Sequence, residues 1–235
     1  MLELYITGVE QNTNKIYITA GIAGTMQSLG YTTSVYKPVE TGVPDGKFQS
    51  KELSVVKYVD PFIKTYYSYQ LQGEMTPILS AAAEGLVMEK SVILKDFQKI
   101  QDRDECLIVD GIQNLGTPIS KDFIEEDIIK MLNIPLLFVV SAKNPDINNV
   151  LLSVKRVNEL GIELRGIIIT DFPKETNDMN VKMMPKLIKE YAGYNVLGKL
   201  PEIEKEINPE DLITEILNNL DLESIFKIKI AKLDT

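Results

Sequence analysis

Short runs of almost uninterrupted apolar residues constrain the fold of this chain more than any other feature. They cover residues 4–7, 106–109, 135–140 and 166–169, and each is followed by glycine or by a polar residue. Segments with the apolar spacing of amphipathic helices separate them. Strands that are apolar throughout are buried on both faces, as in parallel sheets. The pattern therefore predicts an α/β fold with a doubly wound, mostly parallel sheet and helices on both faces.

The remaining elements complete this alternation. We expect helices over residues 16–29, 52–59, 77–84, 91–101, 124–132, 148–160, 183–191 and, as the closing helix, 210–219. Further strands are expected over residues 32–36, ending at Lys37-Pro38, and over 65–71 and 196–197. Residues 42–49 read as a loop, and the tail 225–235 carries no functional interpretation. With no repeat, linker or low-complexity segment, residues 1–235 are predicted to form a single domain.

Composition excludes several classes of function. The net charge of −9 and the lack of any basic run argue against nucleic-acid binding, which needs clustered Lys and Arg. The chain has no histidine, so acid–base or metal chemistry must use carboxylates, lysines or hydroxyls. The one cysteine, Cys106, lies in an apolar run and is interpreted as a small buried hydrophobic residue.

The N-terminal residues indicate where the protein resides. They lack the basic segment and the long apolar stretch of a signal peptide. No window approaches the roughly 18 apolar residues of a membrane span. We therefore predict a cytoplasmic protein without a membrane partner.

The first strand–loop–helix unit is a divergent phosphate-binding loop. Such a loop needs a glycine-lined turn, a Lys for the outer phosphates and a Ser or Thr for Mg²⁺. Here Gly8 and Lys15 are in place, but Asn14 stands at the second glycine and Ile16 at the hydroxyl position. Taken alone, this segment is better interpreted as an ordinary turn between a strand and a helix.

Further blocks follow in a characteristic order. They are Lys-Pro-Val-Glu-Thr-Gly at 37–42, Ser-Lys-Glu-Leu at 50–53, Asp-Gly at 110–111, Asp-Ile-Asn-Asn at 146–149, Thr-Asp-Phe-Pro at 170–173 and Gly-Lys-Leu-Pro at 198–201. In this order and spacing the chain resembles dethiobiotin synthetase from residue 4 to about residue 212. The block at 37–42 is the most specific. The resemblance implies a P-loop NTPase-like fold.

The resemblance also implies a reaction. Dethiobiotin synthetases use ATP and Mg²⁺ to form a ureido ring from 7,8-diaminopelargonate and CO₂ through a carbamate and its mixed anhydride with phosphate. This chemistry consists mostly of positioning and charge neutralisation, so it needs no histidine. The implied partners are a small diamine, CO₂ or bicarbonate and, as a homodimer, a second copy of the chain.

Site residues carry over from the family by position. Lys15 and Lys37 are implied as catalytic cations, Glu52 and Asp110 as Mg²⁺ ligands, and Thr41 and Asn148 as substrate contacts, with Asn148 reaching the partner subunit's substrate. The implied nucleotide site comprises Gly8, Glu10, Gln11, Asn12, Thr13, Asn14, Lys15, Ile16, Asp171 and Pro201. Each also has a simpler interpretation: Lys37 as a solvated lysine at a strand end, Glu52 or Asp110 as a cap or exposed charge, and Asn148 as a helix N-cap.

Departures from the family pattern limit the inference. Asn14 replaces Gly, but Asn tolerates a left-handed backbone better than most residues. Ile16 cannot ligate Mg²⁺, Gln11 stands where Thr is usual, and residues 112–114 replace a small Gly-rich turn. Asp171 replaces an Asn that reads adenine. Because a carboxylate only accepts hydrogen bonds, this change predicts weaker selectivity for ATP.

Two classes of function therefore stand side by side. The first is an active cyclo-ligase of the dethiobiotin synthetase type. The second is a degenerate relative that binds a nucleotide or metabolite without ligase activity. A partition-type ATPase of the same superfamily is disfavoured, because such proteins need an intact phosphate loop and usually a basic or amphipathic surface.

Overall fold

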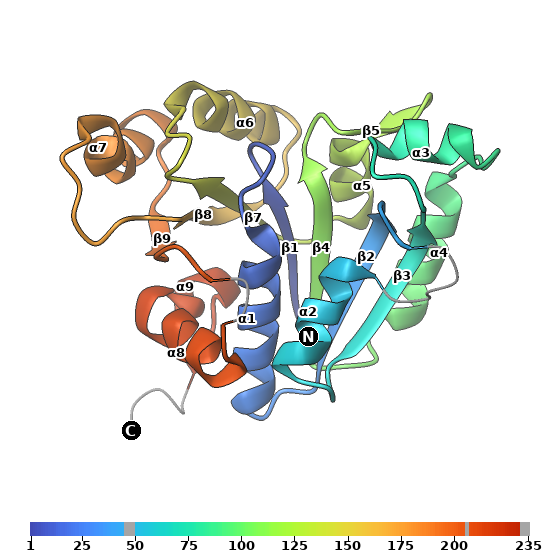
Figure 1. The fold of residues 1–235 in the computed structure, drawn as a ribbon, viewed down its shortest axis with the longest axis horizontal. Helices are drawn as coiled ribbons and strands as arrows, with labels where there is room; N and C mark the ends of the chain where they lie inside the picture. Colours follow the sequence, from blue (N-terminus) through green and yellow to red (C-terminus); the bar gives the residue numbers. More distant parts are fainter. Residues whose placement is uncertain (45–49, 205–206, 231–235) are drawn as a thin grey trace.

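A parallel sheet forms the centre of the computed structural model, which describes residues 1–44, 50–204 and 207–230. The strand order is β3-β2-β4-β1-β7-β8-β9, and every pair in it is parallel (Figure 1). The strands are β1 (Leu2–Gly8), β2 (Thr33–Glu40), β3 (Lys64–Gln70), β4 (Cys106–Asn114), β7 (Leu136–Ser141), β8 (Leu164–Thr170) and β9 (Val196–Lys199). The predicted parallel α/β sheet is confirmed.

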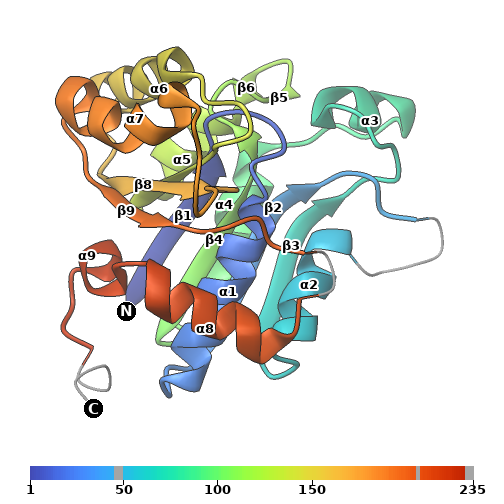
Figure 2. The ribbon, with the colours of Figure 1, turned by 60° about the vertical axis from the view of Figure 1, so that its left-hand side comes forward.

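Helices cover both faces of this sheet. They are α1 (Lys15–Ser28), α2 (Lys51–Val59), α3 (Pro77–Ala83), α4 (Lys90–Ile100), α5 (Glu125–Leu132), α6 (Ile147–Glu159), α7 (Met179–Leu187), the π-helical turn η1 (Ile188–Ala192), α8 (Pro209–Asn219) and α9 (Leu222–Phe226). Figure 2 shows α8 lying across α1, and these two helices are in contact. Sandwiched in this way, α1 is buried along most of its length.

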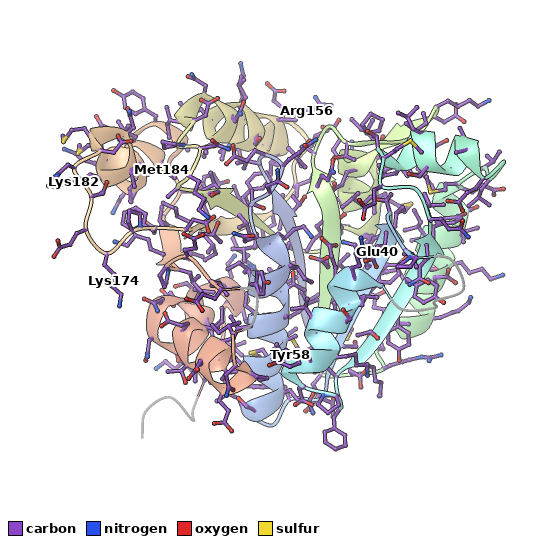
Figure 3. All side chains as sticks on the ribbon, in the orientation of Figure 1. Glu40, Tyr58, Arg156, Lys174, Lys182 and Met184 are labelled. Carbon is purple, nitrogen blue, oxygen red and sulfur yellow. The ribbon has the colours of Figure 1, made fainter. Side chains whose placement is uncertain are left out.

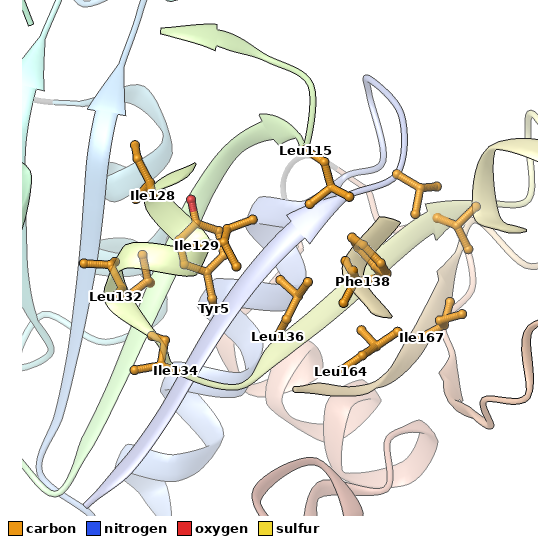
Figure 4. Close-up of a cluster of buried hydrophobic side chains, with 14 of the residues drawn as sticks. Tyr5, Leu115, Ile128, Ile129, Leu132, Ile134, Leu136, Phe138, Leu164 and Ile167 are labelled. Carbon is orange, nitrogen blue, oxygen red and sulfur yellow. The ribbon is translucent and has the colours of Figure 1, made fainter. Parts of the chain in front are cut away.

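The side chains of each strand alternate between two apolar clusters. In β1, Leu4 and Ile6 pack with α1, α2, α8 and α9, whereas Tyr5 packs with α4, α5, α6 and α7. Figure 4 shows part of the second cluster, where Tyr5 lies near Leu136 and Ile129. Because side chains alternate with a period of two, a strand buried on both faces must be apolar at every position. This explains the unbroken apolar runs.

Strand β2 continues past the predicted end at Lys37-Pro38 and runs to Glu40. Its ladder with β4 stops at Tyr36, which pairs with Val109, so Pro38 interrupts no hydrogen bonds on that side. On the other side the register with β3 skips Pro38. The strand therefore accommodates the proline and carries Lys37 within the sheet.

Strand β4 also runs further than its apolar run predicts. Its register with β1 shifts between the pairs Ile6–Asp110 and Gly8–Asn114, which marks a bulge. Asp110 is therefore inside the strand instead of following it. The hairpin of β5 (Pro118–Ser120) and β6 (Phe123–Ile124) and helix α9 were not predicted, and α8 is not the closing helix.

One smaller prediction is wrong at its boundary. Helix α7 begins at Met179, four residues before the predicted start at 183, because Asp178 caps it by accepting from the Asn180 N–H. No helix in the described part of the chain is long and apolar enough to cross a membrane. The loop expected at 42–49 and the tail at 225–235 lie partly outside the described residues.

Candidate active site

A cleft of about 640 Å³ opens at the carboxyl ends of β1 and β2, the edge where open α/β sheets bind ligands. Many predicted site residues line it together: Glu10, Gln11, Asn12, Thr13, Asn14, Lys15, Ile16, Lys37, Thr41 and Glu52. They come from the loop after β1, the end of β2 and the start of α2. The tertiary structure therefore brings together residues that are up to 42 positions apart, from Glu10 to Glu52.

The loop between β1 and α1 has a tightly constrained backbone. A side chain at Gly8 would lie 2.6 Å from the Glu10 carbonyl oxygen and 2.7 Å from that of Gln113, so only glycine fits. Asn12 and Asn14 both have left-handed backbones, with φ of 58° and 54°. The tolerance of Asn for this conformation, inferred from the sequence, is therefore used at both positions.

A buried ion cluster lies beside this loop. Lys15 Nζ donates to Asp110 Oδ1 at 2.6 Å, and Lys37 Nζ donates to Asp110 Oδ2 at 2.7 Å. Thr19 adds a hydroxyl donor to Oδ1 at 2.8 Å, and Lys37 also reaches the Gly111 carbonyl oxygen. The side chains of Lys15, Lys37 and Asp110 are 7%, 2% and 0% exposed. Two cations thus share one carboxylate away from solvent.

Mutual attraction within the cluster outweighs the cost of burial. Burial alone would raise the pKa of Asp110, but the ammonium groups of Lys15 and Lys37 hold that pKa well below its usual range. Burial alone would lower the pKa of Lys37, but Asp110 and Glu52 hold it well above its usual range. Asp110 and Lys37 therefore stay charged at neutral pH. The alternative readings of Lys37 and Asp110 as solvated or capping residues are wrong.

Two glutamates extend the cluster towards the cleft. Glu52, in the first turn of α2, forms an ion pair with Lys37, while Ser50 caps the helix. The Glu52 N–H donates to Glu40 Oε1 at 3.0 Å, and Glu40 Oε2 has no hydrogen-bond partner among the described residues. Figure 3 labels Glu40 near the end of β2. Burial raises the pKa of Glu40 to about 7, although Lys37 and the Glu52 N–H oppose the shift.

Glu125 is a buried carboxylate that sequence reasoning missed. It accepts from the Ile112 and Gln113 N–H groups of the β4 bulge, at 3.0 and 2.8 Å, and from the Thr7 hydroxyl at 2.7 Å. Burial raises its pKa, and these donors offset part of the rise. An acid in a first helical turn usually faces solvent, so the sequence held no signal for this role. Glu125 supports the bulge that places Asp110.

Asp171 lies at the end of β8 and contacts the same loop from the opposite side. Its side chain is 1% exposed, and Oδ1 accepts from the Asn14 side-chain amide at 2.9 Å. Oδ2 accepts from the Ser141 hydroxyl at 2.6 Å. Both carboxylate oxygens therefore already have partners within the protein.

Neither Asn148 nor Pro201 lines the cleft. Asn148 is exposed in the first turn of α6, where Asp146 is the N-cap and accepts from the Asn148 N–H. Interpreting Asn148 as the N-cap is therefore wrong. Pro201 follows Leu200, whose backbone bonds to Ile169 and Phe172 fix the β9 end beside β8.

Cys106 is fully buried, as predicted, and burial raises its pKa to about 12.

The two predicted Mg²⁺ ligands, Glu52 and Asp110, offer the carboxylate oxygens that suit this ion, and both Asp110 oxygens already accept hydrogen bonds from Lys15, Thr19 and Lys37. Within residues 1–44, 50–204 and 207–230 no group of three or more His, Cys, Asp or Glu side chains is placed to hold a metal ion. Glu52 and Asp110 contribute hard carboxylate oxygens on either side of Lys37. Two protein carboxylates suffice for Mg²⁺, which usually keeps several waters and binds substrate phosphates.

Comparison with known families places this site in context. A family described as the AAA domain matches residues 3–226. The chain belongs to this family. Several dethiobiotin synthetases are also similar to the chain over most of its length, which confirms the predicted resemblance.

An ATP-dependent dethiobiotin synthetase of Nitrosopumilus maritimus is 27% identical over 237 residues, covering 97% of this chain and all of that protein. That of Clostridium perfringens is 28% identical and covers 91% of this chain and 97% of its own length. That of Bacillus subtilis is 23% identical, covering 94% and 96%. The similarity to these synthetases thus extends over nearly the whole of each protein.

Solved structures show the same fold at low identity. A ParA family ATPase from Chlorobium tepidum has a TM-score of 0.58 at 10% identity, covering 100% of this chain and 98% of its own. The septum site-determining protein MinD of Pyrococcus horikoshii, solved with Mg-ADP, has a TM-score of 0.57 at 12% identity, covering 99% and 88%. This AAA domain protein therefore has the P-loop NTPase-like fold predicted for it.

Proposed function

We propose that this protein is an ATP- and Mg²⁺-dependent cyclo-ligase of the dethiobiotin synthetase type. The observation that carries the proposal is the buried Lys15–Asp110–Lys37 cluster beside a cleft lined by the loop after β1. Phosphoryl transfer needs cations held where negative charge develops. The similarity to dethiobiotin synthetases over nearly the full length supports the choice of reaction.

The proposed reaction closes a ring from a vicinal diamine, 7,8-diaminopelargonate. One amine adds to CO₂ and loses a proton, which forms a carbamate. A carbamate oxygen attacks the γ-phosphorus of ATP, ADP leaves, and a carbamoyl phosphate results. The second amine then attacks the carbonyl carbon, phosphate leaves and the ureido ring closes. The protein's task is to position these groups and to neutralise charge.

Each cluster residue has a role in this scheme. Lys15 binds the phosphates and the developing carbamate charge, and Lys37 faces the carbamate and γ-phosphate. Both are held by Asp110, so an incoming phosphate would offer each lysine a second anionic partner. Thr41 lines the same cleft and is proposed to contact the diamine.

The nucleotide site is proposed to use the loop after β1 and two strand ends. Its members are Gly8, Glu10, Gln11, Asn12, Thr13, Asn14, Lys15 and Ile16, with Asp171 after β8 and Pro201 after β9. Helix α1 starts at Lys15, so its N-terminus would face the phosphates. Glu52 and Asp110 would hold Mg²⁺, which supplies further neutralisation of phosphate charge when bound.

Three predictions about the whole molecule remain. The exposure of Asn148 in α6 leaves it accessible to a partner copy, which supports the proposed homodimer. A single domain over residues 1–235 is supported by the one sheet that joins all seven parallel strands. The cytoplasmic location stays a prediction.

Phosphate release tests the proposed reaction. We expect release that depends on both the diamine and bicarbonate, with a ureido product detected by mass spectrometry. Lys37→Ala is expected to abolish it. Absence of product at saturating ATP and Mg²⁺ would overturn the ligase proposal.

A second candidate is a nucleotide- or metabolite-binding relative without ligase activity. Ile16 favours it, because this side chain lines the cleft without offering a hydroxyl to Mg²⁺. Calorimetry with Mg·ATP separates the two proposals. Ordinary affinity without turnover would favour the binding protein, whereas turnover with both substrates would reject it.

A further inference from the structure

The loop after β1 is attached to the end of β8 by two contacts. Asn14 Nδ2 donates to Asp171 Oδ1 at 2.9 Å, and the Thr170 hydroxyl donates to the Thr13 carbonyl oxygen at 2.8 Å. These residues are 157 positions apart in the sequence. Hydrogen bonds to the end of β8 therefore hold the backbone just before Lys15.

Asn14 needs such support. It is the N-cap of α1 with φ 54° and ψ 25°, yet its side chain makes no capping bond to the helix. A left-handed backbone is unfavourable for a residue with a Cβ and is ordinarily taken by glycine. Asn usually compensates by bonding locally, but here the side-chain amide is directed to Asp171 instead.

Contacts outside the loop also hold the Asp171 carboxylate in place. Ser141, the last residue of β7, donates its hydroxyl to Asp171 Oδ2 at 2.6 Å. Lys143 Nζ lies 3.7 Å from Oδ1. A buried carboxylate that accepts hydrogen bonds at both oxygens is a rigid acceptor, and the bond from Asn14 is strengthened by its charge.

We propose that Asp171 is a positioning residue that acts through Asn14 to hold the loop in its phosphate-binding conformation. The two departures from the family pattern, Asn14 for Gly and Asp171 for Asn, thus form one unit. The carboxylate stabilises a backbone that glycine would adopt unaided, and the next residue is Lys15. This inference rests on the proposed function for its ligand, Mg·ATP.

A double-mutant cycle tests the coupling. In the native chain, Asp171→Ala is expected to weaken Mg·ATP binding about tenfold, the effect of one charge-assisted hydrogen bond. In an Asn14→Gly background the same change is expected to cost less than about twofold, because glycine needs no support. Calorimetry measures both, and Asp171→Asn, which keeps an acceptor for Asn14, is expected to restore most of the affinity. Equal losses in the two backgrounds would overturn the proposal.

Kinetics and a matched control separate positioning from general stability. Asp171→Ala is expected to raise the KM for ATP about tenfold while kcat changes less than about twofold. Asp104 is a matched aspartate, because it and Asp171 are both 7% exposed when the whole residue is counted. It pairs with Lys64 at 2.7 Å, remote from the cleft. Asp104→Ala is expected to leave the KM unchanged. A comparable rise in that variant would reject a specific role for Asp171.

Hydrogen exchange tests the positioning role of Asp171 in the absence of nucleotide. Amides of residues 12–17 are expected to exchange faster in Asp171→Ala than in the native chain. In the Asn14→Gly background, adding Asp171→Ala is expected to leave the exchange rates of the same amides unchanged. If the native protein binds no Mg·ATP, the proposed function fails while this comparison still reports on the loop. Unchanged exchange in Asp171→Ala would overturn the positioning role. Should that variant fail to fold, Asn14→Ala gives the same readout from the loop side.

Discussion

At the ends of β2 and β4 the site is held by charge, whereas at the end of β8 it is held by hydrogen bonds to a loop. Asp110 forms ion pairs with both Lys15 and Lys37 on the first side. Asp171 fixes Asn14 and accepts from Ser141 on the second. On the first side Lys15, Lys37 and Asp110 stand at the positions predicted from the family, whereas Asn14 and Asp171 on the second side are two departures from its pattern. Buried charges need their partners, whereas a backbone conformation can be stabilised by more than one kind of contact.

Removal of Asp110 is expected to have the largest effect. Asp110→Ala removes the counter-ion of the buried Lys15 ammonium group and leaves Lys37 paired with Glu52 alone. It should destabilise the protein by about 3–5 kcal/mol, more than Asp171→Ala. Urea unfolding measures both variants. Because its pKa is lowered from 3.8, Asp110 contributes stability that is present above that pH and lost as the pH falls below it. Equal destabilisation by the two variants would contradict the contrast between the two sides.

Glu40 is expected to make the charged side sensitive to pH. Its pKa is raised from 4.5 to about 7, with Lys37, Glu52 and Asp110 as the charges that face it. The folded state therefore binds the proton more tightly, so stability falls as the pH rises from 4.5 to 7, by about 3 kcal/mol at most. In Glu40→Gln this fall should be absent from unfolding curves at pH 5 and 8. A parallel decline in both proteins would show that another group is responsible.

Restoration of the family residues in the loop is expected to have a moderate effect. Asn14→Gly with Ile16→Thr returns a glycine at the turn and a hydroxyl for Mg²⁺, and should raise turnover severalfold, roughly the value of one hydrogen bond. Steady-state phosphate release measures it. Ile16→Val, which adds no hydroxyl, is the control. If the double variant turns over no faster, the loop is not what limits the reaction.

Nucleotide preference is expected to show the smallest effect. Both oxygens of Asp171 already accept hydrogen bonds, so Asp171→Asn should leave the preference among ATP, GTP and CTP within about twofold of the native chain. Competition binding measures it. A clear gain in ATP preference would instead support the sequence-based prediction that Asp171 weakens adenine selectivity. That prediction and the positioning role give opposite results here.

Several elements were predictable because burial leaves a direct mark on sequence. Apolar runs located the central strands, and helical spacing located α1 and α6 to within one residue at each end. The prediction ended β2 at Lys37-Pro38, whereas the strand runs to Glu40. Only the tertiary structure shows that the pairing of β2 with β4 ends at Tyr36, so that Pro38 interrupts no hydrogen bond there. The hairpin β5–β6 and α9 are too short for periodicity to reveal.

Sequence alone determined the parallel α/β sheet and the left-handed tolerance of Asn14, because both follow from local chemistry, whereas the family resemblance implied Lys15 and Lys37 as candidate cations. Tertiary structure decided that Asp110 is shared by both lysines, that Glu125 supports the β4 bulge, and that Asp171 holds Asn14. These contacts join residues from 12 to 157 positions apart. Only the packing of strand ends brings such residues within hydrogen-bonding distance, and burial there makes each contact strong.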